Sequence, residues 1–255
     1  MLRIERRGPI AIWTIDRPEA RNALDAATMQ ALAAALAEAG ADPSLRVAIL
    51  TGAGDVFVSG GDLRELRDRS TSADAEILSD AGFALTRAIA DLRFPVICAM
   101  PGPAVGGGAE LAIACDMRVA ASGARIAFVQ TRMGICTAWG TVPRLCALVG
   151  PGVAGRLLYT ARSVDTGEAR ELGLLDDVVA SGTALDTALL WAEEIAKGSP
   201  PAVAAMKRLV RATTDSIVSA VRPLERDAFV ATWTGPDHAE AVEAYFERRL
   251  PRWRV

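Results

Sequence analysis

Short runs of hydrophobic residues, bounded by turn residues, dominate the first half of the chain. Runs of roughly four to eight residues with such boundaries are typical of buried strands. The pattern predicts strands at 9–15 (PIAIWTI), 46–51 (RVAILT), 95–100 (PVICAM), 116–120 (DMRVA) and 125–129 (RIAFV). Helical patterns separate some of these runs, and this alternation predicts α/β organisation.

Hydrophobic positions at helical spacing lie between the first two of these strands. Asp25 can cap a helix that carries Met29, Leu32 and Leu36 on one face, and Gly40 can end it. A short helix is also expected after the glycines that follow PVICAM. Both features fit strands that are connected by helices.

The pattern changes near residue 183, after which it is helical. Helices are predicted within 184–198, 201–213, 216–232 and 237–249. We therefore expect an α/β core over residues 1–190 and a helical C-terminal region over residues 191–255.

Composition and charge narrow the class of protein. The chain has 255 residues, of which 51% are hydrophobic, so it can bury a sizeable core and is not expected to be disordered. Its formal net charge is −3, without a basic block, so no nucleic-acid partner is expected, although a local cationic pocket for a small anion is compatible with it. The sequence has no apolar run of about 18 residues and no secretory cleavage site, so no membrane partner is expected.

Cysteine and histidine usage excludes further classes of site. The four cysteines lie in apolar contexts without a CxxC pair, which is typical of core thiols in the reducing cytoplasm. His238 is the single histidine, and its position predicts an exposed polar residue at the start of a helix. Neither a Ser-His-Asp triad nor a metal site is therefore expected.

Two glycine loops follow two of the predicted strands and carry the candidate chemistry. They read SGGD at 59–62 and GGG at 106–108. Glycine leaves backbone N–H groups bare, and two such groups that converge would hold a carbonyl oxygen and stabilise an oxyanion. Glu110 lies about one helical turn after Gly107, so an acid that transfers protons would lie beside that oxyanion. The alternative is that the glycines only allow tight turns and Glu110 stabilises a helix N-terminus.

Other glycine motifs do not fit this sequence. The dinucleotide-binding fingerprint GxGxxG would require a third glycine where Leu111 stands. No GKS or GKT tripeptide occurs, which excludes a P-loop.

Four longer segments carry a family resemblance. They read IDRPEARNALD (15–25), VAILTGAGDVFVSGGDL (47–63), PVICAMPGPAVGGGAELAIACDMRVAA (95–121) and EAVEAYFERRLPRW (240–253). With these segments the chain resembles the crotonase, or enoyl-CoA hydratase/isomerase, superfamily along nearly its whole length. The resemblance implies a fold of repeated ββα spiral turns with a helical C-terminal trimerisation region. It also implies an acyl-CoA thioester ligand, homotrimers or hexamers of paired trimers, and no separate cofactor, because coenzyme A is part of the substrate.

The resemblance also implies roles at matched positions. The oxyanion-hole N–H groups would be those of Gly61 and Gly107, and Glu110 would be the catalytic acid–base group. The residues expected around coenzyme A are Ser59, Asp62 and Leu63, whose backbone would border the adenine, and Arg21, near the phosphates.

Two segments depart from the family pattern. A second glutamate is usual in a segment like AKFGLPEVKLG, but ARIAFVQTRMG (124–134) places Gln130 at that position. An amide forms hydrogen bonds but cannot titrate, which argues against ordinary hydration between two carboxylates. CTAWGTVPRL (136–145) stands where IPGAGGTQRL is frequent, so Ala138 and Trp139 would alter the acyl pocket, unless Trp139 is a large core aromatic.

These features favour an enoyl-CoA hydratase that uses an oxyanion hole and a single glutamate, with Gln130 positioning water or substrate. Dehydration and double-bond isomerisation fit the same residues. Two further alternatives are another crotonase chemistry, such as decarboxylation or thioester hydrolysis, and a non-catalytic CoA-ester-binding protein. The second is motivated by the missing carboxylate at Gln130.

Overall fold

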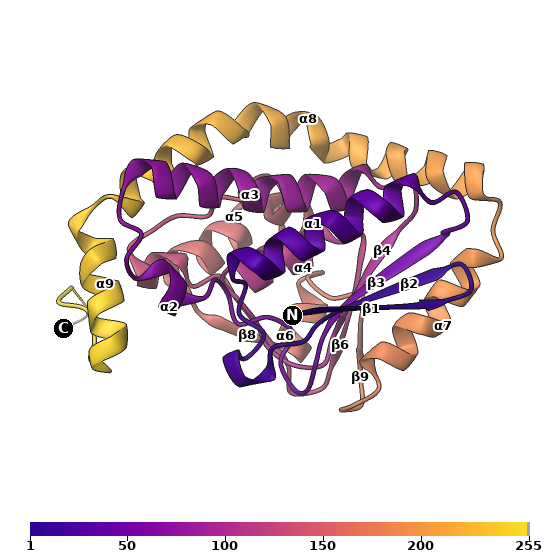
Figure 1. Ribbon diagram of the computed structural model, residues 1–255, viewed down its shortest axis with the longest axis horizontal. Helices are drawn as coiled ribbons and strands as arrows, with labels where there is room; N and C mark the ends of the chain where they lie inside the picture. Colours follow the sequence, from indigo (N-terminus) through magenta and orange to yellow (C-terminus); the bar gives the residue numbers. More distant parts are fainter. Residues whose placement is uncertain (254–255) are drawn as a thin grey trace.

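The computed structural model describes residues 1–253 and contains two sheets with helices packed around them (Figure 1). Among these residues the larger sheet has the strand order β1-β2-β3-β4-β6-β9. Its strands are β1 (Leu2–Arg7), β2 (Ile10–Ile15), β3 (Val47–Gly52), β4 (Val96–Met100), β6 (Met117–Ala121) and β9 (Asp177–Val179). β1 pairs with β2 in antiparallel fashion, and the other neighbours are parallel. The expected α/β class is confirmed.

The central strands are buried on both faces because helices cover both sides of the sheet. Every residue of β2, β3 and β4 is buried, as continuous hydrophobic runs in a parallel sheet require. Successive side chains point to opposite faces, so Leu50 joins one core and Ile49 the other. Helices α1 (Ala26–Ala41) and α3 (Ser72–Asp91) contribute to the first core, and α7 (Ala184–Ala196) contributes to the second.

A smaller sheet of β5 (Ala104–Val105), β7 (Arg125–Ala127) and β8 (Ser163–Asp165) brings two important segments together. β5 and β7 are parallel, and Val105 lies opposite Ala127. Their carboxyl ends therefore lie at the same edge. Helix α4 (Gly107–Ala114) follows the first strand and the 3₁₀ helix η2 (Gln130–Met133) follows the second, so the two helices begin close to one another.

The remaining helices complete the chain, and Figure 1 labels all of them except η1. They are η1 (Pro18–Ala20), α2 (Leu63–Leu66), α5 (Thr141–Thr160), α6 (Thr166–Glu171), α8 (Pro200–Trp233) and α9 (Pro236–Glu247). Asp25 caps α1 as expected, because its carboxylate accepts a hydrogen bond of 2.7 Å from the Thr28 N–H. The pattern does not predict β1, α3 or α5.

One prediction about the helices is wrong, because segments 201–213 and 216–232 form a single helix of 34 residues, α8. The Thr-Thr-Asp sequence at 213–215 has weak helix propensity and suggests a break. In the structure the hydroxyls of Thr213 and Thr214 bond back to carbonyls of the preceding turn. Packing of α8 against α3 and α5 outweighs the weak local preference.

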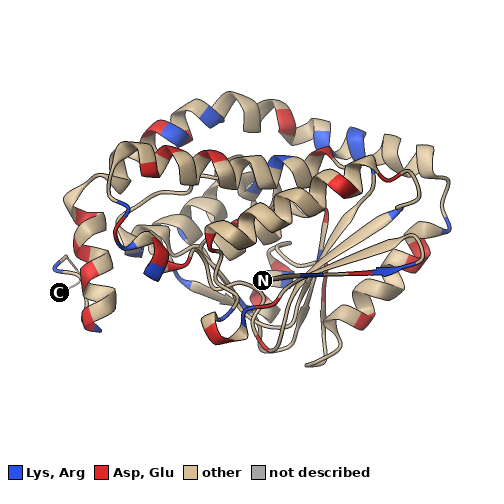
Figure 2. Ribbon diagram, in the orientation of Figure 1, with Lys and Arg blue, Asp and Glu red and all other residues tan. Residues whose placement is uncertain are grey.

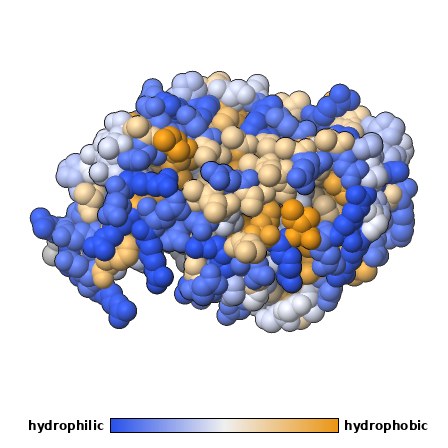
Figure 3. All heavy atoms as spheres, in the orientation of Figure 1, coloured by the Kyte–Doolittle hydropathy of each residue, from blue (hydrophilic) through white to orange (hydrophobic). Residues whose placement is uncertain are grey.

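The surface agrees with the balanced composition. Figure 2 shows basic and acidic residues interspersed along the helices. Figure 3 shows a band of weakly hydrophobic surface across the middle of this face, bordered by hydrophilic residues. None of the helices among residues 1–253 is both long and apolar enough to cross a membrane.

Candidate active site

Glu110 is buried in the first turn of α4, with 4% of its surface exposed. The helix begins at Gly107 after Gly106, which has a φ of 54°. That left-handed backbone favours glycine, so the glycine run is needed to turn the chain from β5 into the helix. α4 starts inside the molecule, so the Glu110 carboxylate in its first turn is buried.

Three hydrogen bonds hold the Glu110 carboxylate. The Gln130 amide donates to Oε1 at 2.5 Å. The Trp139 N–H and the Thr141 hydroxyl donate to Oε2 at 3.1 Å and 2.6 Å. The structure thus brings together Glu110 and Gln130 from adjacent strand ends, while the Gln130 Oε1 atom is buried without a hydrogen-bond partner among residues 1–253.

The environment of Glu110 raises the pKa of its carboxyl group toward neutral pH. Burial is the main cause that raises the pKa of Glu110, from an ordinary value of 4.5 to about 7. The Thr141 hydrogen bond lowers this pKa, the negative charge of Glu225 raises it, and the hydrogen bonds from Gln130 and Trp139 lower it. A carboxyl group with a pKa near 7 can both accept and return a proton at physiological pH.

Glu225 on α8 is a second buried carboxylate that the sequence did not reveal. It is 5% exposed and accepts hydrogen bonds from the Thr137 hydroxyl at 2.9 Å and the Gly140 N–H at 2.7 Å. It also accepts from the Thr141 N–H at 3.2 Å. The segment 137–141 therefore divides its donors between Glu110 and Glu225. No local pattern in the sequence signals this role, since Glu225 lies on a helix far along the chain.

The two glycine loops adjoin each other. The Val105 N–H donates to the Val58 carbonyl at 2.9 Å, which joins the strand before one loop to the segment before the other. A Cβ atom built on Gly60 would lie 4.0 Å from the Gly107 nitrogen. Within residues 1–253, neither the Gly61 N–H nor the Gly107 N–H has a hydrogen-bond acceptor. Both N–H groups are therefore available to a ligand.

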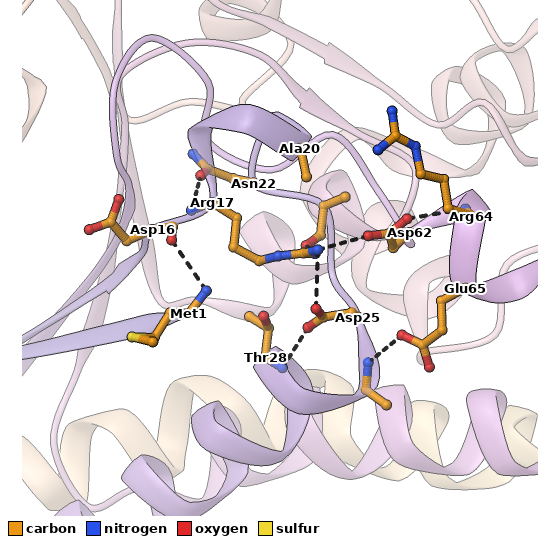
Figure 4. A network of polar contacts seen from close by, with 12 residues as sticks. Met1, Asp16, Arg17, Ala20, Asn22, Asp25, Thr28, Asp62, Arg64 and Glu65 are labelled. Carbon is orange, nitrogen blue, oxygen red and sulfur yellow. Dashed lines mark hydrogen bonds and ion pairs between the residues drawn. The ribbon is translucent and has the colours of Figure 1, made fainter.

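An ion-pair network fixes the loop that carries Gly61 (Figure 4). The Arg17 guanidinium lies 2.9 Å from the Asp62 carboxylate and 3.1 Å from that of Asp25. Two backbone hydrogen bonds flank Gly61, from Leu24 to the Gly60 carbonyl and from Asp62 to the Leu24 carbonyl. Arg17 is thus a supporting residue that sequence reasoning missed, although it stands in the segment IDRPEARNALD.

The residues expected around coenzyme A line the adjoining surface. Ser59 is half-buried, with its hydroxyl 3.5 Å from the Ala20 carbonyl, and Leu63 is half-buried at the start of α2. The Asp62 carboxylate caps α2 and forms an ion pair with Arg17. Arg21 is exposed and has a left-handed backbone. It lines a surface hollow of about 290 Å³ together with Pro18, Asn22, Ala53, Asp55 and Val56.

Trp139 is buried, with 5% of its surface exposed, and belongs to the larger core. Its carbonyl accepts hydrogen bonds from the Thr86 hydroxyl at 2.8 Å and the Arg144 guanidinium at 2.6 Å. The preceding Ala138 is also buried. Trp139 is therefore a large core aromatic, and its backbone N–H also donates a hydrogen bond to Glu110.

His238 corrects one sequence-based expectation. His238 was expected to be exposed, but it is buried, with 6% of its surface accessible. α9 packs it against Trp233, with ring centroids 4.3 Å apart. Its Nδ1 lies 2.8 Å from the Met133 carbonyl oxygen, and burial lowers its pKa. Among the described residues, no group of three or more His, Cys, Asp or Glu side chains is placed to hold a metal ion.

Comparisons with known proteins agree with this architecture. The family model described as Enoyl-CoA hydratase/isomerase matches residues 5–255. A short-chain-enoyl-CoA hydratase of Clostridium acetobutylicum is 33% identical over 96% of this chain and 94% of its own length. A carnitinyl-CoA dehydratase of Salmonella arizonae is 37% identical, over 99% of this chain and 98% of its own length. The crystal structure of an enoyl-CoA hydratase from Mycobacterium avium subsp. paratuberculosis superposes with a TM-score of 0.90 at 26% identity, covering 100% of this chain and 98% of that one.

Proposed function

Because the chain belongs to the enoyl-CoA hydratase/isomerase family, we propose that it adds water to a 2-enoyl-CoA thioester with Glu110 as its single acid–base group. The observation that carries this proposal is the buried Glu110 carboxylate, held by three hydrogen bonds one helical turn after Gly107. Its raised pKa, about 7, suits a group that must take and return one proton.

The proposed reaction moves one proton and one electron pair. Glu110 takes a proton from water as the water oxygen bonds to Cβ of the substrate. The electron pair of the double bond moves to the thioester oxygen, and the Gly61 and Gly107 N–H groups stabilise the resulting enolate. Glu110 then returns the proton to Cα and the thioester carbonyl re-forms. No electron acceptor is needed, so we propose that the reaction requires no cofactor beyond the coenzyme A of the substrate.

Gln130 supports this chemistry without titrating. Its amide nitrogen donates to Glu110, while its carbonyl oxygen is buried without a partner in the described part of the chain. A buried acceptor without a donor is unfavourable, so it is suited to accept a hydrogen bond from the attacking water. We propose that Gln130 orients this water and fixes the orientation of the Glu110 carboxylate.

Position 130 carries an amide instead of a second carboxyl group, and this favours one alternative, a double-bond isomerase. A single base can move a double bond by taking a proton from one carbon and returning it to another. Incubating the protein with crotonyl-CoA in deuterated water separates the cases. Hydration gives the 3-hydroxyacyl product with deuterium at Cα, whereas isomerisation removes a proton from Cγ, adds one at Cα and gives the 3-enoyl isomer without adding water. Neither product would be formed by a protein that only binds CoA esters.

The pH dependence of hydration should follow Glu110. We expect kcat/KM to rise with pH and to level off above about 7, because hydration starts with the ionised carboxylate and its pKa is raised to about 7. The measurement is kcat/KM for crotonyl-CoA between pH 5 and pH 9 at constant ionic strength. A profile that is flat across neutral pH would contradict the assignment of Glu110 as the base.

Restoring a carboxylate at position 130 tests whether its absence limits the enzyme. Gln130→Glu should raise hydration of crotonyl-CoA by about tenfold, because one carboxyl group can then donate while the other accepts. Gln130→Met is the matched control, since it keeps the length of the side chain without polar atoms and should lower activity. Initial rates of loss of the conjugated thioester absorbance measure both. A Gln130→Glu variant no faster than the parent would show that the site is built around the amide.

We propose that coenzyme A lies along the segments 17–25 and 53–63. The hollow of about 290 Å³ beside Arg21 supports this placement, because it offers a cation to the phosphates. Ser59, Asp62 and Leu63 would border the adenine through their backbone.

The four cysteines form no disulfide, which supports a reducing compartment such as the cytoplasm.

We further propose that the region after residue 190 assembles the protein into trimers or paired trimers. Large hydrophobic side chains are more than half exposed along one face of α8, where an uncovered surface is unfavourable. They are Met206, Leu209, Val210, Ile217 and Leu224. Light scattering coupled to gel filtration should give the mass of a trimer or hexamer. A mass of one chain at micromolar concentration would contradict this assembly.

A further inference from the structure

We propose that the Trp139 indole closes the acyl side of this site and restricts the enzyme to short acyl chains, of about the length of a butyryl group. This inference rests on the proposed function and deepens it. It concerns the side chain of Trp139, whereas the contact with Glu110 described above uses only its backbone.

The indole fills the space between α3 and α4. A Cβ atom built on Gly82 of α3 would overlap the Nε1, Cδ1 and Cε2 atoms of the ring. A Cβ atom built on Gly107 of α4 would lie 2.7 Å from Cη2, at the opposite edge of the ring. Both helices therefore have glycine where they meet Trp139, and the ring is in close contact with each of them.

The indole also lies alongside the path from the oxyanion donor to the acid. The backbone nitrogen of Trp139 is 3.1 Å from the Glu110 carboxylate, and the far edge of its ring contacts Gly107. A thioester oxygen held by the Gly107 N–H places the Cα and Cβ atoms between that N–H and Glu110. The ring thus forms the wall beside the reacting carbons.

A longer acyl chain would have to displace this wall. Trp139 is 5% exposed and belongs to the larger core, so its ring cannot shift without disturbing packed neighbours. Its carbonyl is held by Thr86 and Arg144, which fixes the backbone from which the indole projects. Each methylene that a hydrophobic pocket accepts or rejects changes specificity by about tenfold or more.

The experiment measures chain-length preference by binding as well as by turnover. Calorimetry gives the Kd of butyryl-CoA and octanoyl-CoA for the parent, Trp139→Leu and Trp139→Phe, and circular dichroism checks the fold of each. We expect the parent to bind butyryl-CoA at least about tenfold more tightly than octanoyl-CoA. Trp139→Leu should bring the two affinities within about threefold, and Trp139→Phe, which retracts from Gly107, should give an intermediate ratio.

A matched control and the contrary results complete the test. Trp191→Leu changes a half-buried tryptophan of α7, in the core on the opposite face of the sheet, and should keep the ratio of the parent. A parent that binds octanoyl-CoA as tightly as butyryl-CoA would overturn the proposal, even if the Trp139 variants do not fold. An unchanged ratio in folded Trp139→Leu would overturn it too. Preference for butyryl-CoA without hydration of crotonyl-CoA would support this inference and contradict the proposed function instead.

Discussion

Glu110→Gln should lower kcat for hydration of crotonyl-CoA by about a thousandfold, the size expected for removing a positioned group that transfers protons. Glutamine keeps the size of the side chain, and its carbonyl oxygen can still accept from the Trp139 N–H and the Thr141 hydroxyl. It cannot take a proton from water, so the loss falls on kcat. The measurement is the steady-state rate at pH 8, with KM expected to stay within about threefold.

Glu38→Gln is the matched control for this variant. Glu38 is exposed on α1, so the same chemical change there should leave kcat unchanged. Full activity in Glu110→Gln would show that another group moves the proton, and the proposed site would be wrong.

The same variant should be more stable than the parent at alkaline pH. The raised pKa of Glu110, about 7 against 4.5, means that ionisation favours the unfolded chain. This cost is absent below pH 4.5, grows as the pH rises toward 7 and is constant above it. At about 1.4 kcal/mol per pKa unit it reaches about 3 kcal/mol. Urea unfolding at pH 4.5 and pH 8 should therefore show a stability gain for Glu110→Gln at the higher pH alone.

Glu225→Ala should destabilise the fold by about 3 kcal/mol, because it leaves buried donors without an acceptor at about 1–3 kcal/mol each. Those donors are the N–H groups of Gly140 and Thr141 and the Thr137 hydroxyl. Because the same segment donates to Glu110, kcat should fall as well. Urea unfolding measures the first effect, and Glu193→Ala on the exposed face of α7 should stay within about 0.5 kcal/mol of the parent.

Glu225→Gln separates the charge of Glu225 from its hydrogen bonds. The amide keeps the volume and one acceptor but removes the negative charge that raises the pKa of Glu110. The bend in the pH profile of kcat/KM should therefore move below 7. A bend that stays in place would mean that Glu225 supports the segment 137–141 without influencing the protonation of Glu110.

Much of the local structure was predictable because short-range rules govern it. Continuous hydrophobic runs predicted β2, β3, β4 and β6, and the hydrophobic spacing after Asp25 predicted α1. Segments 201–213 and 216–232 show the limit of those rules, because the weak Thr-Thr-Asp sequence was outweighed by packing on α3 and α5. β1 was missed because an exposed edge strand of charged residues, LRIERR, has no hydrophobic run to reveal it.

The sequence by itself determined the glycine turns, the carboxylate one helical turn after Gly107 and the amide at position 130, because these depend on residue type and short spacing. Only the tertiary structure decided what surrounds them. Parallel pairing of β5 and β7 placed Gln130 against Glu110. The long helix α8 places Glu225 against the segment 137–141, which also donates to Glu110. The Trp139 indole lies between α3 and α4. Burial and the field of a distant charge depend on which segments meet in space, and no local pattern encodes that.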